Sequence, residues 1–288
     1  MPISFRFFPF LILSKIPWRV GYLLSDIAYF IIYYAVGYRK KVVRKNLALS
    51  FPELPAAERL KIERNFYKHL CELLFESIKL IGLSKEELMN RMKMISSEKL
   101  DKLILSEKQI ILYSAHLGNW EWYAILPEWM HRPVFGLYLP LSNVYFDALI
   151  NQNRQRFGIG CIPAQTGYRG IMQQVRKGIR GAYMIIGDQS PPRDSKHYYC
   201  RFLNQHTAFT IGAETMAEKM KAMVFFPKIR RTGRGYYEMD LICLWDGTES
   251  ISPGTITQRY ADALENSIRE QPENWLWSHR RWKLTNGK

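Results

Sequence analysis

The sequence lacks the motifs that identify several common enzyme classes. Its four cysteines are widely spaced and form no C-x2-C pair, so neither a zinc site nor a disulfide framework is indicated, and reduced thiols are expected. Its six histidines show no H-x-H or H-E-x-x-H spacing, which gives a metal hydrolase little support. No G-x-S-x-G, Walker or G-x-G-x-x-G motif follows an expected strand. We therefore expect no metal and no cofactor.

Acidic residues are scarce relative to basic ones. The chain has 41 Lys and Arg against 26 Asp and Glu, a formal charge of +15, and 14% aromatic residues. A basic surface rich in aromatic residues needs an anionic partner, and nucleic acid, an anionic membrane face and an acidic carrier protein are the three candidates. With 288 residues the chain can bury a full core, which favours one main domain with a small appendage.

Long hydrophobic runs are also missing, and the longest is near the N-terminus. Residues 20–36 are mostly apolar, interrupted by Ser25 and Asp26, at the short end for a membrane-spanning helix. Five basic residues follow it and favour a cytoplasmic location for the rest of the chain: Arg39, Lys40, Lys41, Arg44 and Lys45. We expect residues 1–45 to form a membrane-associated segment and residues 46–288 the main domain. The alternative is a buried core helix with a solvated basic face.

Expected strands and helices alternate from residue 108 onward. The expected strands are 109–114, 134–139, 182–186, 222–228 and 236–244, and the expected helices are 142–157, 167–177, 210–220 and 255–270. Upstream, residues 56–81 have helical periodicity, and a capping-box pattern at Ser84 opens another helix. The pattern predicts an α/β fold with a mixed, largely parallel sheet flanked by helices on both faces.

The most informative stretch contains His116 and Glu121, an H-x4-E pair. Five residues on an α-helix would place these side chains about 140° apart, so they converge only if the spacer bends. The Leu-Gly step after the strand 109–114 supplies a turn, and Asn119 is a plausible N-cap for a helix that begins Trp-Glu-Trp. His116 then lies at the carboxyl end of a strand, where open α/β sheets bind ligands. A carboxylate beside the imidazole would raise its basicity and prepare it to deprotonate a hydroxyl.

Other residues extend this candidate site, and each has an alternative interpretation. His116 also fits a structural histidine, because the spacing alone is a weak signal. Asp188 follows the strand 182–186 but precedes two prolines, which suits a turn residue equally well. Arg154 lies on the expected helix 142–157 and also fits a solvated face. The C-terminal tail interleaves Trp275, Trp277 and Trp282 with basic residues, which suits an interfacial surface or a cap packed into the core.

Taken together, these stretches resemble the late lipid A acyltransferases, a branch of the lysophospholipid acyltransferase superfamily. The similarity covers nearly the whole chain. It rests on the basic-flanked hydrophobic N-terminal helix and on five ordered blocks: Asn46-Leu-Ala-Leu-Ser-Phe-Pro-Glu53, Ser114-Ala-His-Leu-Gly-Asn-Trp-Glu121, Asn153-Arg-Gln-Arg-Phe-Gly158, Gly187-Asp-Gln189 and Glu273-Asn-Trp-Leu-Trp-Ser-His-Arg-Arg-Trp-Lys283. The resemblance implies a glycerol-phosphate-acyltransferase-like fold, with residues 46–288 as the catalytic domain.

The resemblance also implies a function and roles for particular residues. A fatty acyl chain would pass from a thioester, on acyl carrier protein or acyl-CoA, to a hydroxyl of a membrane lipid acceptor at the cytoplasmic face of a bacterial inner membrane. His116 would be the general base and Glu121 its orienting partner. Asn119, Arg154, Arg169 and Asp188 would serve the substrates, and backbone N–H groups near Gly118 and Asn119 would stabilise the oxyanion.

The expected partners are an acyl thioester donor, a lipid acceptor and the anionic membrane surface, with no nucleic acid. Two alternatives remain open from the sequence. One is the same chemistry on an aminolipid or a lysophospholipid. The other is a non-catalytic protein that binds anionic surfaces.

Overall fold

The computed structural model describes residues 8–284 and confirms the α/β class. Its main sheet has seven strands in the order β1-β9-β8-β2-β5-β3-β4. Their bounds are β1 Met92–Met94, β2 Ile110–Ser114, β3 Val134–Tyr138, β4 Ile159–Pro163, β5 Ala182–Ile186, β8 Met223–Gly233 and β9 Tyr236–Trp245. All neighbours pair in parallel except β8 and β9, so the sheet is mixed and largely parallel, as predicted. The strands β6 (His197–Phe202) and β7 (Gln205–Thr210) form a separate antiparallel pair.

The central strand β2 positions the residues that follow it in the sequence, which include His116. All five of its residues are buried, because parallel strands between two helical layers carry apolar side chains on both faces. β2 pairs with β5 so that Ser114 lies opposite Ile186. The residues that follow these two strands therefore emerge side by side at one edge of the sheet.

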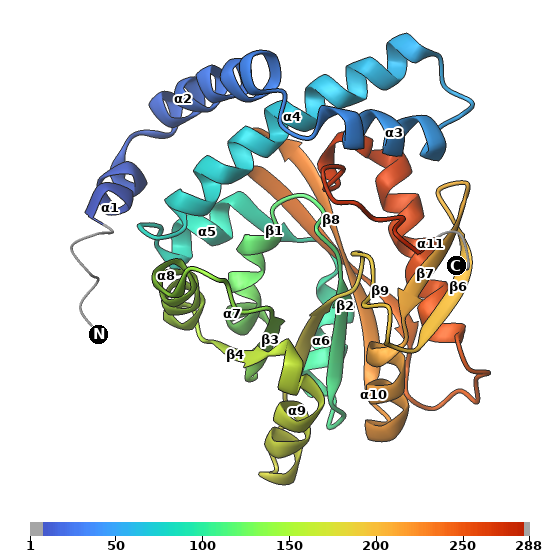
Figure 1. Ribbon diagram of the computed structural model, residues 1–288. Helices are drawn as coiled ribbons and strands as arrows, with labels where there is room; N and C mark the ends of the chain where they lie inside the picture. The colour runs from blue at the N-terminus through green and yellow to red at the C-terminus, as the bar shows by residue number, and fades with distance from the viewer. Residues whose placement is uncertain (1–7, 285–288) are drawn as a thin grey trace.

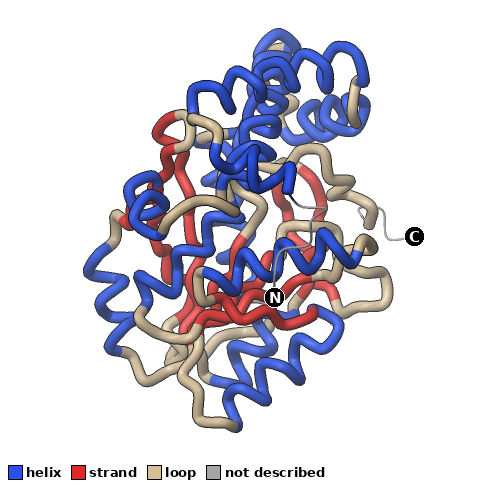
Figure 2. The backbone as a smooth tube through the Cα atoms, turned by 90° about the vertical axis from the view of Figure 1, so that its left-hand side faces the viewer, coloured by secondary structure: helices blue, strands red, loops and turns tan. Residues whose placement is uncertain are grey.

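Helices cover both faces of the sheet (Figures 1 and 2). The helices from the middle of the chain onward are α5 Lys85–Arg91, α6 Ser97–Leu105, α7 Leu126–Met130, α8 Val144–Arg156, α9 Gly167–Arg176, α10 Gly212–Met220 and α11 Thr255–Glu270. The sequence predicted α8 to α11 closely. It missed the short or polar elements β1, β4, β6, β7 and α6, whose length or mixed composition gives little periodicity.

One expected helix is wrong in detail. The residues after Asn119 form a 3-10 helix, Trp120–Ile125, which continues into α7, and the Asn119 side chain makes no capping hydrogen bond. Its amide instead donates to Glu76 Oε2 at 2.7 Å. By contrast, the predicted cap of α5 is confirmed, because Ser84 Oγ accepts from the Glu87 N–H at 3.1 Å.

The N-terminal helices pack on the long helix α4 (Ala56–Lys79), which lies between them and the rest of the fold (Figure 1). They are α1 Phe8–Lys15, α2 Trp18–Phe30, a π-helical continuation Ile31–Val36, and α3 Lys40–Ser50. α2 and its continuation are tied to buried carboxylates of α4, because Tyr22 donates to Glu76 at 3.1 Å and Tyr33 to Glu63 at 2.8 Å.

The side of α2 that faces away from α4 is apolar and exposed. Its side chains recur at helical spacing: Val20, Leu23, Leu24, Ile27, Phe30, Ile31 and Tyr34. The two polar interruptions of the apolar run do not belong to this face, since Ser25 is buried and Asp26 pairs with Arg234 of the β8–β9 turn. Within residues 8–284 no single helix is long and apolar enough to cross a membrane. The segments 18–36 and 40–50 pass such a test only together, across a 93° bend.

Candidate active site

His116 and Asp188 meet at the shared edge of β2 and β5. His116 Nδ1 lies 2.8 Å from Asp188 Oδ1, and the His116 backbone N–H donates to Asp188 Oδ2 at 3.1 Å. Asp188 is only 2% exposed, and Trp275 Nε1 also donates to its Oδ2, at 2.8 Å. Asp188 is therefore not a simple turn residue. It is a buried carboxylate that fixes both the backbone and the ring of His116.

This contact corrects the expected partner of the imidazole. Glu121 does not hold the ring. Both of its oxygens accept from Arg154 Nη2, at 3.0 and 3.1 Å, in a partly exposed ion pair. The sequence placed Glu121, Arg154 and Asp188 at one site, but it assigned the orientation of the His116 ring to Glu121, the carboxylate nearest to it in sequence. Because β2 and β5 are adjacent, Asp188 lies closer to the ring than Glu121 does.

The electrostatics around His116 make its imidazole more basic than a free histidine. Burial alone lowers the pKa of His116, but the Asp188 carboxylate outweighs it, with a smaller contribution from Glu121, and the net pKa lies above its ordinary value. Burial raises the pKa of Asp188, yet its hydrogen bonds and the adjacent His116 bring it below the ordinary value. An ionised Asp188 accepts the Nδ1 proton. The Nε2 lone pair is then available as a base.

Two expected site residues lie elsewhere. Asn119 is fully buried and bonded to Glu76, so it supports the turn between His116 and Glu121 and does not line the pocket described below. Arg169 is exposed on α9 and does not line that pocket either. The geometry therefore places neither residue at the pocket, and a substrate role for Arg169 stays a prediction.

The structure adds Trp275, which sequence reasoning did not place at the site. Trp275 and Trp277 are buried in the main core, and Trp282 packs partly buried against it, so the tail is a cap and not a free interfacial surface. Trp275 reaches Asp188 from this cap. The tail's three tryptophans were a visible signal, but their spacing carries no information about which one faces the site.

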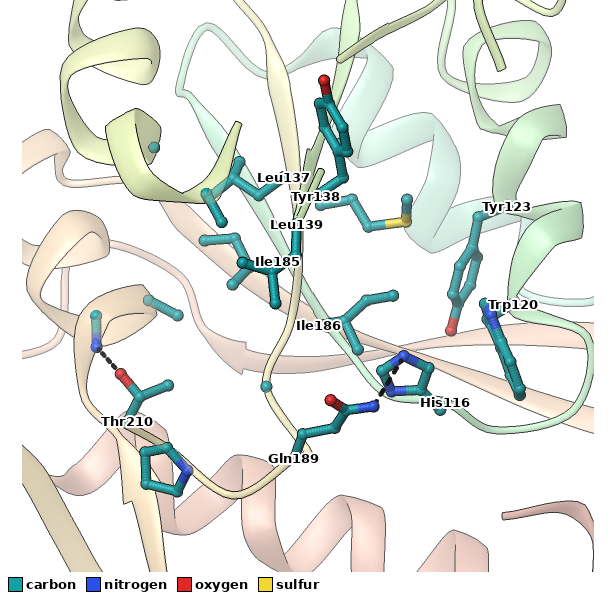
Figure 3. Close-up of a pocket in the computed structure, with 18 of the residues that line it drawn as sticks. His116, Trp120, Tyr123, Leu137, Tyr138, Leu139, Ile185, Ile186, Gln189 and Thr210 are labelled. Carbon is teal, nitrogen blue, oxygen red and sulfur yellow. Dashed lines mark hydrogen bonds between the residues drawn. The ribbon is translucent and has the colours of Figure 1, made fainter. Parts of the chain in front are cut away.

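A pocket of about 960 Å³ opens beside His116, near the upper end of the range of roughly 300–1,000 Å³ typical of ligand sites. Its polar lining includes His116, Glu121, Arg154 and Gln189. Its apolar lining comes from β3, β5, α8 and α10 and includes Leu137, Leu139, Ile150, Met184, Ile185, Ile186 and Met216. Figure 3 shows His116 and Gln189 facing one another, with Leu137, Leu139 and Ile185 above them in the view. A histidine beside an apolar space of this volume suits a reaction on a lipid chain.

Comparison with known proteins identifies the family. The model of the bacterial lipid A biosynthesis acyltransferases matches residues 4–284. A lipid A biosynthesis acyltransferase of Haemophilus influenzae is 24% identical over 248 residues, covering 84% of this chain and 76% of the relative. The lipid A biosynthesis lauroyltransferase of Escherichia coli is 25% identical over 249 residues, covering 85% and 79%. The palmitoleoyltransferase of the same organism is 24% identical over 252 residues, with the same coverage. The chain belongs to this family.

As a member of the lipid A biosynthesis acyltransferase family, the protein is an acyltransferase.

The turn after His116 requires glycine, because Gly118 has φ +59° and an added Cβ would lie 2.6 Å from Ile229 Cγ2. However, the Gly118 N–H already donates to the Asn274 carbonyl at 2.9 Å. This contact contradicts the expectation that Gly118 supplies an N–H to an oxyanion. In residues 8–284 no three His, Cys, Asp or Glu side chains are grouped as metal ligands would be.

Proposed function

We propose that this acyltransferase moves a fatty acyl chain from an acyl thioester, on acyl carrier protein or coenzyme A, to a hydroxyl of a lipid A precursor. The transfer takes place at the cytoplasmic face of a bacterial inner membrane. The printed names of the relatives, a lauroyltransferase and a palmitoleoyltransferase of lipid A biosynthesis, support the acceptor class.

A single observation carries the mechanism: the His116 imidazole is held at Nδ1 by the buried Asp188 carboxylate, and its Nε2 is turned toward the pocket. This is the arrangement in which a histidine removes a proton from a hydroxyl, and a positioned base of this kind contributes about 10²–10⁴-fold to the rate. Side chains that line the same pocket provide apolar space for the acyl chain.

The reaction proceeds in one ternary complex. The acceptor hydroxyl gives its proton to His116 Nε2 while its oxygen forms a bond to the thioester carbonyl carbon, and the carbonyl π electrons move to oxygen. The C=O bond then re-forms, the C–S bond breaks, and the thiolate takes the proton from the imidazolium. Asp188, with a smaller contribution from Glu121, stabilises the imidazolium between these steps. A thioester is already activated, so no covalent acyl-enzyme is required.

The N-terminal helices bring this chemistry to the membrane. The exposed apolar face of α2 has no protein partner in the described part of the chain, and Lys15, Arg19 and Arg39 are exposed beside it. We propose that α2 lies in the headgroup region with this face toward the acyl chains, which is the behaviour of interfacial amphipathic helices. The half-exposed ion pair of Asp26 with Arg234 favours an interfacial placement over a spanning one.

The test is acyl transfer by purified protein in lipid vesicles. Wild-type protein should attach one acyl chain to a lipid A precursor when supplied with acyl carrier protein or coenzyme A thioesters, detected by mass spectrometry. His116→Ala should reduce the rate at least about 10²-fold. His206→Ala, which removes an exposed histidine outside the pocket, should leave it unchanged.

Repeating the assay with a lipid A precursor, an aminolipid and a lysophospholipid as acceptors discriminates between the possible functions. Transfer to an aminolipid or a lysophospholipid, but not to lipid A, would keep the mechanism and replace the acceptor. No transfer to any lipid hydroxyl would contradict the proposed function.

A further inference from the structure

The reaction described above leaves one requirement unassigned. Attack on the thioester places negative charge on the carbonyl oxygen, and a hydrogen-bond donor that faces this oxygen is usually among the largest contributions to catalysis. The donor must lie close to His116 Nε2, since the attacked carbonyl carbon lies one bond beyond the hydroxyl oxygen that Nε2 deprotonates.

Three donors near His116 are already engaged, whereas the buried Ser190 hydroxyl, which lines the same pocket, has no hydrogen-bond partner within residues 8–284. The Gly118 N–H is bonded to Asn274, and the Asn119 amide is buried against Glu76. Arg154 lines the pocket, but its Nη2 is bonded to both oxygens of Glu121, which neutralises its charge.

We propose that Gln189 is a catalytic residue whose side-chain amide donates a hydrogen bond to the oxyanion. Its Nε2 lies 3.4 Å from His116 Nε2, and Figure 3 shows the amide directed at the imidazole. Because His116 Nδ1–H donates a hydrogen bond to Asp188, Nε2 of the neutral ring is an acceptor, and the amide group facing it is the NH₂ group. The inference rests on the proposed acyl transfer and assigns a new role within the same site.

The segment that carries Gln189 is fixed on both sides. The Gly187 N–H donates to the Ser114 carbonyl at 3.0 Å, and a Cβ at Gly187 would lie 2.2 Å from the Tyr113 ring, so the segment packs directly on β2. Asp188 is held by His116 and Trp275. These contacts position the amide before substrate binds, which is what an oxyanion donor requires.

His279 of the C-terminal tail fixes the other side of this segment. The Ser190 N–H donates to His279 Nε2 at 3.2 Å. Burial lowers the pKa of His279 to about 4, so its ring is neutral at physiological pH and able to accept this bond. His279 is thus a positioning residue for Gln189.

During the reaction the hydroxyl of the acceptor lipid replaces the Gln189 amide as the hydrogen-bond partner of His116 Nε2. The displaced NH₂ group remains beside the thioester carbonyl and donates to its oxygen as the C–O bond forms and the π electrons move there. When the C=O bond re-forms and the thiolate departs, the donated bond weakens again. Gln189 exchanges no proton and no electrons, so its contribution is confined to the transition state.

The experiment compares Gln189→Ala and the isosteric Gln189→Glu with wild type, using the vesicle assay above. Removing one oxyanion donor costs about 10²–10³ in kcat. We expect a loss of this size in both variants, with donor and acceptor KM changed by less than about threefold and thermal unfolding unchanged. Gln173→Ala, which alters an exposed glutamine of α9, is the matched control and should behave as wild type.

A second readout does not depend on turnover. A trifluoromethyl ketone analogue of the acyl donor adds water or the acceptor hydroxyl across its carbonyl, and the tetrahedral adduct mimics the reaction intermediate, whereas the methyl ketone remains a ketone. Wild type should prefer the first by about 10² or more, and Gln189→Ala should lose most of this preference. Wild-type kcat and an undiminished preference in Gln189→Ala would overturn the assignment.

This outcome differs from failure of the proposed function. If wild type acylates a different lipid hydroxyl, the assignment of lipid A as the acceptor fails. The role of Gln189 is then tested by comparing the same variants on that other acceptor.

Discussion

At the scale of single residues, the central contact is between His116 and Asp188. Proton removal requires neutral His116, whose pKa lies above the ordinary value of about 6.5 because of the Asp188 carboxylate. The rate should therefore rise with pH through an inflection above about 6.5. Replacing Asp188 with Asn removes the charge that raises this pKa, so the inflection should move to lower pH, and kcat should fall at least about 10²-fold because the required tautomer is lost.

The measurement is a pH profile of kcat/KM for wild type and Asp188→Asn. Asp194→Asn, at an exposed position, is the control. An unchanged inflection in Asp188→Asn would mean that Asp188 does not set the basicity of His116.

Glu76 gives a second prediction, this time for stability. It is buried, and although Tyr237, Asn119 and Tyr22 donate to it, burial raises its pKa to about 6. The folded protein then binds more protons than the unfolded chain between about pH 4.3 and pH 6, so the contribution of Glu76 to stability falls as pH rises through this window. The fall is about 2 kcal/mol.

Urea unfolding of wild type and Glu76→Gln at pH 4.5 and pH 7 measures this contribution. The variant should lack about 2 kcal/mol of the pH-dependent change seen in wild type. Identical pH dependence in the two proteins would show that the Glu76 pKa is not raised in the folded state.

These residues also show what sequence reasoning could reach. His116, Glu121, Arg154 and Asp188 were all assigned to one site, and the structure does bring them together. The pairing was wrong because spacing along the chain carries no information on which strands are neighbours. Only the β2–β5 register places Asp188 against His116. Gln189 and Trp275 are positioned by the same long-range contacts, so their places in the site could not be predicted.

At the scale of elements, long helices and buried strands were readable, because each has an apolar period of its own. α11 matches its predicted bounds, 255–270. The conformation of the segment after Asn119 could not be predicted in this way. Asn119 suits an N-cap, but its side chain is bonded to Glu76, more than forty residues away in the sequence. Local capping rules fail where a tertiary partner competes for the same side chain.

The exposed face of α2 carries the element-scale prediction. Replacing Leu23 and Ile27 with Glu puts charge into the face that we propose contacts the membrane. Since burying one such side chain is worth about 1.5–3 kcal/mol, binding to anionic vesicles should weaken at least about tenfold. Leu105→Glu, on α6, is the control, because Leu105 is also an exposed leucine but does not belong to this face. Equal vesicle binding by all three proteins in a sedimentation assay would contradict the proposed placement.

At the scale of the whole molecule, the formal charge of +15 leads us to expect electrostatic attraction of acidic partners. Acyl carrier proteins and lipid head groups are anionic, and attraction between exposed charges is screened over about 8 Å at physiological ionic strength. We therefore expect the KM for an acidic carrier-protein donor to rise several-fold between 50 and about 300 mM salt. A salt-independent KM would argue against electrostatic docking of the donor.

The central claim is that His116 drives acyl transfer to a hydroxyl of lipid A. Mass spectrometry of lipid A from matched cells tests it most directly, comparing cells that lack the gene with cells that express wild type, His116→Ala or His206→Ala. The account predicts a mass increase of one acyl chain with wild type and His206→Ala, and none with His116→Ala. The same increase with His116→Ala, or no change in lipid A with wild type, would contradict it.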